Sequence, residues 1–527
     1  MSAYWLLLPL FLPIIGGAAL GIIKPHSRRV MEIMVMTVTL LTSACVALIL
    51  AVRPDGEAMI LQLAESLSVK FFLDGSSCVF AGLVALLWPI ASLYAIEYME
   101  TEDHRNTFFA YYTMTYGITL GIAFSANLMT MYMFYEMLTL VTIPLMMHGL
   151  KFKAVVATRK YVRYSLGGAA FAFIGFIAIV VFGETIDFRL GGVLADIAGK
   201  RTMLRIVYVM AVLGFGVKAA VFPFHGWLPS ASVAPTPVTA LLHAVAVVKA
   251  GAFAIIRITY YSFGTTFLRG SLAQYTVMGF AVFTMVYGSV KAVKEQHCKR
   301  RLAYSTVSNL SYILFAVTLM TEAGMAAAYA HILAHGLMKI TLFYCIGAVN
   351  VKAHRHYVWE MDGMGRRMKT VFIVYTIAGL SLIGIPPMIG FVSKWYIGNA
   401  AVAQGTVYSY IGLAALILSA LLTAAYILEV VVRAWLPGEQ ATAKVAVKLQ
   451  DNSGEQAAET VSTENTEIQS AQATENASDV QPEGDEIRPV GWRMRLPLVL
   501  LATIVVAMGI WSGPVLRFLA DVAAGLR

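Results

Sequence analysis

The sequence predicts an all-α integral membrane protein of about fourteen transmembrane helices. Of its 527 residues, 59% are hydrophobic and only 13% are charged, with a mean hydropathy of +0.72, which is far from the composition of a soluble domain. Apolar runs of about twenty residues recur along the chain, and each could cross a hydrocarbon core of about 30 Å as a helix. Because backbone amides in lipid must bond within their own segment, these runs indicate a helical bundle.

The predicted spans follow the apolar runs in chain order. The first run has its basic residues, Lys24, Arg28 and Arg29, behind it, which is typical of a retained first helix with its N-terminus outside and not of a cleaved signal peptide. Prolines inside the seventh and twelfth runs predict that these two helices are broken. These prolines are Pro223, Pro386 and Pro387. The spans lie near residues 4–23, 31–52, 73–96, 107–125, 127–149, 161–183, 204–224, 236–259, 272–290, 303–321, 326–349, 370–399, 408–434 and 494–515.

Basic residues in the loops predict the orientation. Up to the thirteenth span, the loops on the proposed cytoplasmic side contain 19 Lys and Arg, and those on the opposite side contain 8. Cytoplasmic loops carry the excess of Lys and Arg in multi-pass proteins. The sequence therefore predicts a multi-pass protein of a bacterial or archaeal cytoplasmic membrane, with both termini outside. This topology accounts for the net charge of +9, so we expect no nucleic-acid partner.

No cofactor or metal site is expected. The four cysteines, Cys45, Cys78, Cys298 and Cys345, are scattered and share no metal-ligand spacing. They are typical of small packing residues. The chain also has no nucleophile constellation or cofactor motif, so we expect it not to catalyse a reaction alone.

The spans group into five segments. Residues 1–106 hold the first three helices, 107–259 form a first repeat of helices four to eight, and 272–434 form a second, inverted repeat of helices nine to thirteen. Between residues 435 and 493 the apolar pattern is lost, and from Glu439 to Glu486 there are eleven acidic residues against two lysines. This segment is typical of a disordered cytoplasmic loop, and both a tolerated insertion and a docking role stay open for it. Residues 494–527 hold the last helix.

Ionisable residues within the predicted spans are the candidate functional residues. A charge at bilayer depth costs roughly 2.5–3.5 kcal/mol on insertion scales, so each such residue needs a reason. Helix breaks also admit water and direct half-helix ends at ion sites. The residues are Glu136, Lys218, His243, Lys249, His331, His335, Lys339 and Lys394, beside the breaks at Pro223, Pro386 and Pro387.

Lys218 and Glu136 suggest the sharpest hypothesis. If Glu136 is the carboxylate beside the buried lysine, separating the pair would make Lys218 release a proton, and rejoining it would recapture one. A static buried salt bridge between two helices is the alternative. The further protonatable groups favour the switch, because a released proton has somewhere to go.

The other residues suggest a relay. His331, His335 and Lys339 are spaced at i, i+4 and i+8, which places them along one face of a helix. His243 and Lys249 are about 120° apart on a regular helix, so they share a path only if that helix is distorted. On its own, His331 is also compatible with a packed polar residue.

Several motifs together resemble those of the antiporter-like subunits of respiratory complex I, Mrp-type Na⁺/H⁺ antiporters and membrane-bound energy-converting hydrogenases. The resemblance covers about residues 74–433. The motifs are Tyr135-Glu136, Lys218, the segment FPFHGWLPSASVAPTPVTALLH from Phe222 to His243, the segment KRRLAYS from Lys299 to Ser305, the run from His331 to Lys339, and the segment GIPPMIGFVSK from Gly384 to Lys394.

The resemblance implies roles by matching position. It makes Glu136 and Lys218 the modulating pair, Lys249 and Lys339 the central relay, and Lys394 the terminal group that exchanges with the outside. It also implies that the chain moves protons, with Na⁺ as an alternative ion, and that its partners are other membrane subunits, including further antiporter-like ones.

Two assemblies remain open. The main expectation is an ion-translocating subunit of a redox-driven complex of the energy-converting hydrogenase or complex I type. The alternative is a D-type subunit of a Mrp antiporter without redox activity, and the segment TLVTIPL from Thr139 to Leu145 resembles D subunits and hydrogenase relatives more than complex I. The acidic segment is outside the shared pattern.

Overall fold

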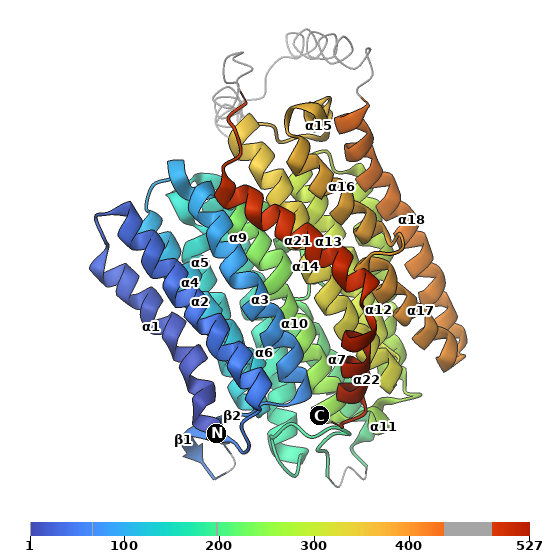
Figure 1. The fold of residues 1–527 in the computed structure, drawn as a ribbon. Coiled ribbons are helices and arrows are strands. Elements are labelled where there is room, and N and C mark those ends of the chain that lie inside the picture. The colour runs from blue at the N-terminus through green and yellow to red at the C-terminus, as the bar shows by residue number, and fades with distance from the viewer. Residues whose placement is uncertain (1, 66, 196–198, 437–486, 527) are drawn as a thin grey trace, which may run out of the picture.

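The computed structural model describes residues 2–65, 67–195, 199–436 and 487–526. The described residues form a bundle of inclined helices, with both chain ends near its lower edge in Figure 1. The first helices lie at one side of the bundle and α17 and α18 at the other. The all-α membrane class predicted from the sequence is confirmed.

The N-terminal part adds a small sheet that the sequence did not predict. A hairpin connects the second and third helices, and its two antiparallel strands place Ala58 opposite Phe71. The elements are α1 (Leu7–Ile23), α2 (Arg28–Val52), β1 (Ala58–Ala64), β2 (Leu67–Phe71) and α3 (Gly75–Tyr98).

The next group contains the first break. Helix α7 ends at Gly216, ahead of Pro223, so Lys218 lies in the break itself and not mid-helix as the predicted span 204–224 placed it. The reason is local, because Ala220 has a positive φ of 55°, outside the helical region. The elements are α4 (Arg105–Ala123), α5 (Leu128–Met146), α6 (Phe152–Phe182), α7 (Arg201–Gly216), α8 (Trp227–Ser230), α9 (Thr236–Ala240), α10 (Val247–Ile256) and α11 (Thr265–Leu268).

The predicted eighth span is continuous but irregular. Two π-helical stretches, Leu241–Val245 and Arg257–Phe263, lie before and after α10. Such π turns are frequent at functional sites. Among the ten candidate spans of the described residues, this one is the most enclosed, since every residue of its most apolar window is buried.

The third group contains the second break, at Gly384–Met388, as Pro386 and Pro387 predicted. Gly390 lies in the first turn of α17, and a Cβ there would come within 1.8 Å of the carbonyl oxygen of Ser381 in α16. The two half-helices therefore pass in direct backbone contact. The elements are α12 (Leu272–Lys294), α13 (Cys298–Thr318), α14 (Glu322–Ala353), α15 (Met364–Arg367), α16 (Lys369–Ile383), α17 (Ile389–Gln404) and α18 (Val407–Trp435).

The last predicted span, 494–515, is two helices, α21 (Trp492–Ile510) and α22 (Gly513–Ala523). Helix α21 crosses the front of the bundle obliquely in Figure 1 and packs on α3, α14, α16 and α17. Its Gly509 allows this, because a Cβ there would meet the Pro387 carbonyl oxygen at 2.1 Å. Most of the acidic segment predicted to be a disordered loop lies outside the described residues.

Ten helices of the described chain are long and apolar enough to cross a membrane. The broken helices and the polar α13 are not among these ten, because their helical stretches are short or rich in polar residues. The multi-pass membrane location is confirmed. The count of fourteen crossings and the two inverted repeats stay predictions.

Candidate functional site

The break after α7 brings Lys218 to Glu136 of α5. The Lys218 Nζ lies 3.9 Å from the Glu136 Oε1, and the lysine side chain is 1% exposed while that of the glutamate is 25% exposed. Lys218 also donates to the backbone carbonyl of Tyr135, and its Nζ lies 3.3 Å from the centre of the Tyr135 ring. The pair is in contact but long, and the lysine has a second, neutral partner, so the two charges can separate without leaving the ammonium unsolvated.

Neighbouring residues hold the Lys218 backbone. Trp227 donates from its indole Nε1 to the Val217 carbonyl, at 2.7 Å, and the Ala220 amide donates to the same carbonyl at 3.1 Å. Gly251 of α10 packs against the same segment, and a Cβ there would meet the Ala219 amide nitrogen at 2.6 Å and the Lys218 carbonyl carbon at 2.9 Å. The position of Lys218 therefore depends on a glycine less than one turn of helix away from Lys249.

The π turn is the distortion that His243 and Lys249 require if they are to share a path. His243 lies inside the first π stretch, Lys249 lies in the α10 helix that follows, and both are fully buried. The ring of His243 lies 4.8 Å from that of Phe343 on α14. A π turn holds more residues than an α turn and so changes the angle between side chains on either side of it.

Helix α14 carries three of the predicted residues and connects two neighbouring helices. His335 contacts Lys249 through its Nδ1, 2.5 Å from the Nζ. Four residues on, Lys339 donates to Ser305 of α13 and, at 3.1 Å, to the Leu302 carbonyl. Two imidazoles follow each other on this face, with the ring centres of His331 and His335 6.0 Å apart.

The ionisable side chains from Glu136 to Lys394 form one buried row, and this row ends at the second broken helix. The Nδ1 of His331 lies 2.9 Å from the hydroxyl of Ser393, next to Lys394 on α17. Lys394 donates to the carbonyls of Leu382 and Ile383, at 2.7 and 2.8 Å. These carbonyls belong to the last turn of α16, where the negative end of the helix dipole favours a cation.

The charges of the row are unbalanced. Within the described ranges, Glu136 is the single carboxylate that forms an ion pair with a lysine of the row, and Lys249, Lys339 and Lys394 are held by imidazole, hydroxyl or carbonyl groups. Their exposed fractions are 0%, 0% and 7%. Each amine thus lies where its ionised form is costly, which suits a group that takes up and gives away a proton. Across the described residues, no three His, Cys, Asp or Glu are grouped to hold a metal ion.

Three basic residues at or near the ends of the predicted spans are buried. Lys299 and Arg301 lie in the first turn of α13, and Arg301 bonds Glu429 at 2.8 Å and the Tyr426 carbonyl at 3.0 Å. Arg257 lies at the start of the second π stretch and pairs with Asp74, the N-cap of α3. Lys299 donates to the Ala234 carbonyl at 3.1 Å, whereas the two arginines reach carboxylates that are distant in the sequence.

Comparison with known proteins places this arrangement in a family. Residues 125–423 match the family described as "NADH:quinone oxidoreductase/Mrp antiporter, TM". The chain belongs to this family. The match covers more than half of the chain and includes the whole row from Glu136 to Lys394.

Curated relatives come from two kinds of complex. The chain is 30% identical over 361 residues to NADH-quinone oxidoreductase subunit N of Desulforudis audaxviator. This aligned region covers 68% of this chain and 70% of the relative. It is also 30% identical over 349 residues to a Na⁺/H⁺ antiporter subunit of Alkalihalophilus pseudofirmus, which covers 62% of this chain but only 42% of that relative's length.

Two solved structures share the fold over nearly the whole chain. One is a chain of the membrane-bound sulfane sulfur reductase, an archaeal respiratory membrane complex, with a TM-score of 0.78 at 20% identity. The other is a chain of the Mrp complex from Dietzia sp. DQ12-45-1b, with a TM-score of 0.80 at 21% identity. Each match covers 99% of this chain and 97% of the other. The protein is thus an antiporter-like membrane subunit of the kind found in multisubunit complexes, and other membrane subunits are its partners.

Proposed function

We propose that the chain is a proton-translocating membrane subunit of a multisubunit, redox-driven complex of the energy-converting hydrogenase or complex I type. The observation that carries this proposal is the buried row itself, which begins at Glu136 and contains four lysines, the last of them Lys394, in four different segments of the bundle. Chains of ionisable groups at mid-depth are how proton relays are built in pumps. Electron transfer belongs to other subunits of the complex.

In this proposal, Glu136 and Lys218 are the switch. While the carboxylate is near, Lys218 keeps its proton. When a neighbouring subunit moves Glu136 away, the ammonium loses its stabilising charge and passes the proton towards Lys249, with water bridging the gap. Return of the carboxylate recharges the lysine. The ring and carbonyl of Tyr135 hold the amine in place through both states.

The relay then follows the contacts of α14. The nitrogen pair of Lys249 and His335 shares one proton, because one of the two nitrogens must offer a lone pair for the contact to be a hydrogen bond. From His335 the proton continues to Lys339 on the next turn, or through His331 and Ser393 to Lys394. His243 lies beside this route and serves as a further acceptor.

A D-type subunit of a Mrp antiporter is the second candidate, with Na⁺ exchanged against protons. The segment TLVTIPL after Glu136 supports this candidate as much as a hydrogenase-type complex, and the fold is shared with the Mrp complex as well as with the archaeal respiratory complex.

Purification of the whole complex through a tag on this chain separates the two functions. Iron–sulfur and hydrogenase-like subunits among the co-purified proteins support the redox assignment, whereas a set of small membrane subunits without them supports the Mrp assignment. Proton uptake is then measured in inverted membrane vesicles, driven by an electron donor in one case and by a Na⁺ pulse in the other. If neither driving force moves protons in the vesicles, both proposed functions are contradicted.

A further inference from the structure

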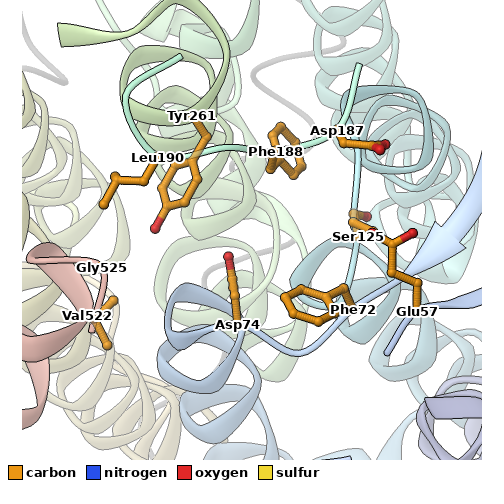
Figure 2. A pocket seen from close by; sticks show the side chains of 11 residues that line it. Glu57, Phe72, Asp74, Ser125, Asp187, Phe188, Leu190, Tyr261, Val522 and Gly525 are labelled. Atoms are coloured by element: carbon orange, nitrogen blue, oxygen red, sulfur yellow. The ribbon is translucent and has the colours of Figure 1, made fainter. Parts of the chain in front are cut away.

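A pocket outside the buried row lies at the end of the bundle where both termini are found. It has a volume of about 210 Å³. Figure 2 shows Tyr261, Phe188 and Asp187 along one side of it and Asp74, Phe72 and Glu57 along the other. The positive-inside pattern places this end on the outer side of the membrane.

A chain of hydroxyl groups leads from this pocket into the bundle. Tyr261, in the second π stretch, lines the pocket, and its hydroxyl lies 2.7 Å from that of Ser76 on α3. The hydroxyl of Tyr329 on α14 donates to the same serine, also at 2.7 Å. Tyr329 and Ser76 are fully buried. Three hydroxyls from three helices thus form one continuous path from α14 to the pocket.

A fixed cation lies at the pocket end of this chain. Arg257 is 1% exposed and pairs with both oxygens of Asp74, and its guanidinium lies 4.7 Å from the Tyr261 ring centre and 4.9 Å from that of Phe188. Lys70 bonds both Asp187 and Glu57, at 2.6 and 2.8 Å. Three carboxylates thus line the pocket, while the two cations that pair with them, Arg257 and Lys70, lie outside its lining, and the excess negative charge favours a hydronium ion in the pocket.

The inner end of the chain lies near the relay. Tyr329 precedes His335 by six residues on α14, which is about 9 Å along the helix axis and about 120° around it, so the proposed path needs two or three waters to pass around the helix between the two side chains. The direct route along α10 is closed, because Phe253 lies between Lys249 and Arg257 and its ring packs on Phe80 with centres 4.9 Å apart. The hydroxyl chain passes beside this apolar block.

We propose that the pocket is a second outer opening of the buried row, through which protons pass between α14 and the outside by way of Tyr329, Ser76 and Tyr261. This rests on the proposed function and adds an opening to the one at Lys394. Each hydroxyl accepts a proton from one neighbour and gives its own to the next, so one proton crosses and none is consumed. Water in the pocket takes the proton beside Asp74.

The opening itself is tested by thiol labelling. Ser125 is buried and lines the pocket, so Ser125→Cys in the assembled complex should react with an impermeant methanethiosulfonate added outside, above the background of the parent chain. Ser92→Cys on α3 is the control, because Ser92 is equally buried but is not part of the pocket lining. Equal labelling of the two variants would contradict the proposal that the pocket opens to the outside.

The path is tested by proton uptake in vesicles. Lys394→Ala should keep a transport rate above that of Lys218→Ala, and adding Tyr261→Phe should lower it to the Lys218→Ala rate. Tyr208→Phe, the matched control, removes a buried hydroxyl bonded to Thr259 away from the chain and should lower nothing.

The outcomes are distinguishable. Wild-type transport in Lys218→Ala overturns the proposed function. Loss in Lys218→Ala together with equal loss in Lys394→Ala, or with no effect of Tyr261→Phe, overturns the second opening alone.

Discussion

The carboxylate of Glu97, near the C-terminal end of α3, holds the last helix against the bundle. It accepts the backbone amides of Gly491 and Met494, at 2.7 and 3.1 Å, and forms an ion pair with Lys352 at 2.9 Å. Its side chain is 6% exposed, and that of Lys352 is 12% exposed. Replacement by glutamine keeps the shape and removes the charge, so Glu97→Gln leaves the lysine ammonium buried without its partner.

The expected cost follows from this geometry. Removing one partner of a buried ion pair costs about 3–5 kcal/mol, and the partial exposure of Lys352 places the value near about 3 kcal/mol. Lys352→Met should cost less, about 1–2 kcal/mol, because Glu97 keeps its two amide bonds at the positive end of the α21 dipole. The double variant leaves no ammonium without a partner, so it should lose less free energy of unfolding than the two single variants lose together.

The assay is a double-mutant cycle on the free energy of unfolding of the full chain, titrated with SDS in mixed micelles. A coupling energy of about 1 kcal/mol or more supports the account. If the two losses add, or if Glu97→Gln unfolds like the wild type, the carboxylate does not hold α21.

Two further predictions concern a histidine and a glycine. Burial, together with nearby Lys299, lowers the pKa of His297, the N-cap residue of α13, to about 4 from 6.5. Between these two pH values the unfolded chain binds more protons than the folded one. The stabilisation is therefore fully present above pH 6.5, and it falls by up to about 3 kcal/mol as the pH drops to 4. His297→Gln should flatten this slope in unfolding curves recorded across pH 4–7. Gly251→Ala should reduce proton uptake without removing a charge, because the new Cβ displaces the Lys218 backbone. Gly279→Ala, where the added methyl meets nothing within 4 Å, should transport normally, and equal rates in the two variants contradict this explanation.

Much of the row could be predicted because charge in lipid is rare. Lys249, Lys339 and Lys394 stand out in apolar runs, and their cost in a bilayer needs no partner in the sequence to be recognised. Prolines likewise predicted the break before Lys394. The sequence also placed His331, His335 and Lys339 on one helix face, since the i+4 spacing survives in a regular helix.

The remaining features depend on contacts between distant segments. The break at Lys218 begins before Pro223, since it depends on the backbone of Ala220 and on packing against Gly251. The π turn at His243 has no characteristic amino-acid composition, so the sequence does not reveal it. Arg257 resembles an interfacial residue until the fold brings Asp74 to it from 183 positions away.

The pair of Glu136 and Lys218 is the centre of the account, and one double substitution separates a switch from a static salt bridge. Glu136→Leu with Lys218→Met replaces the pair by apolar groups of similar size, which is often neutral for stability. The measurement is proton uptake by the assembled complex in inverted vesicles, beside the single variants Glu136→Ala and Lys218→Ala. We expect the double variant to assemble as the wild type does and all three variants to lose transport. Wild-type uptake in the double variant, or in both single variants, would contradict the switch.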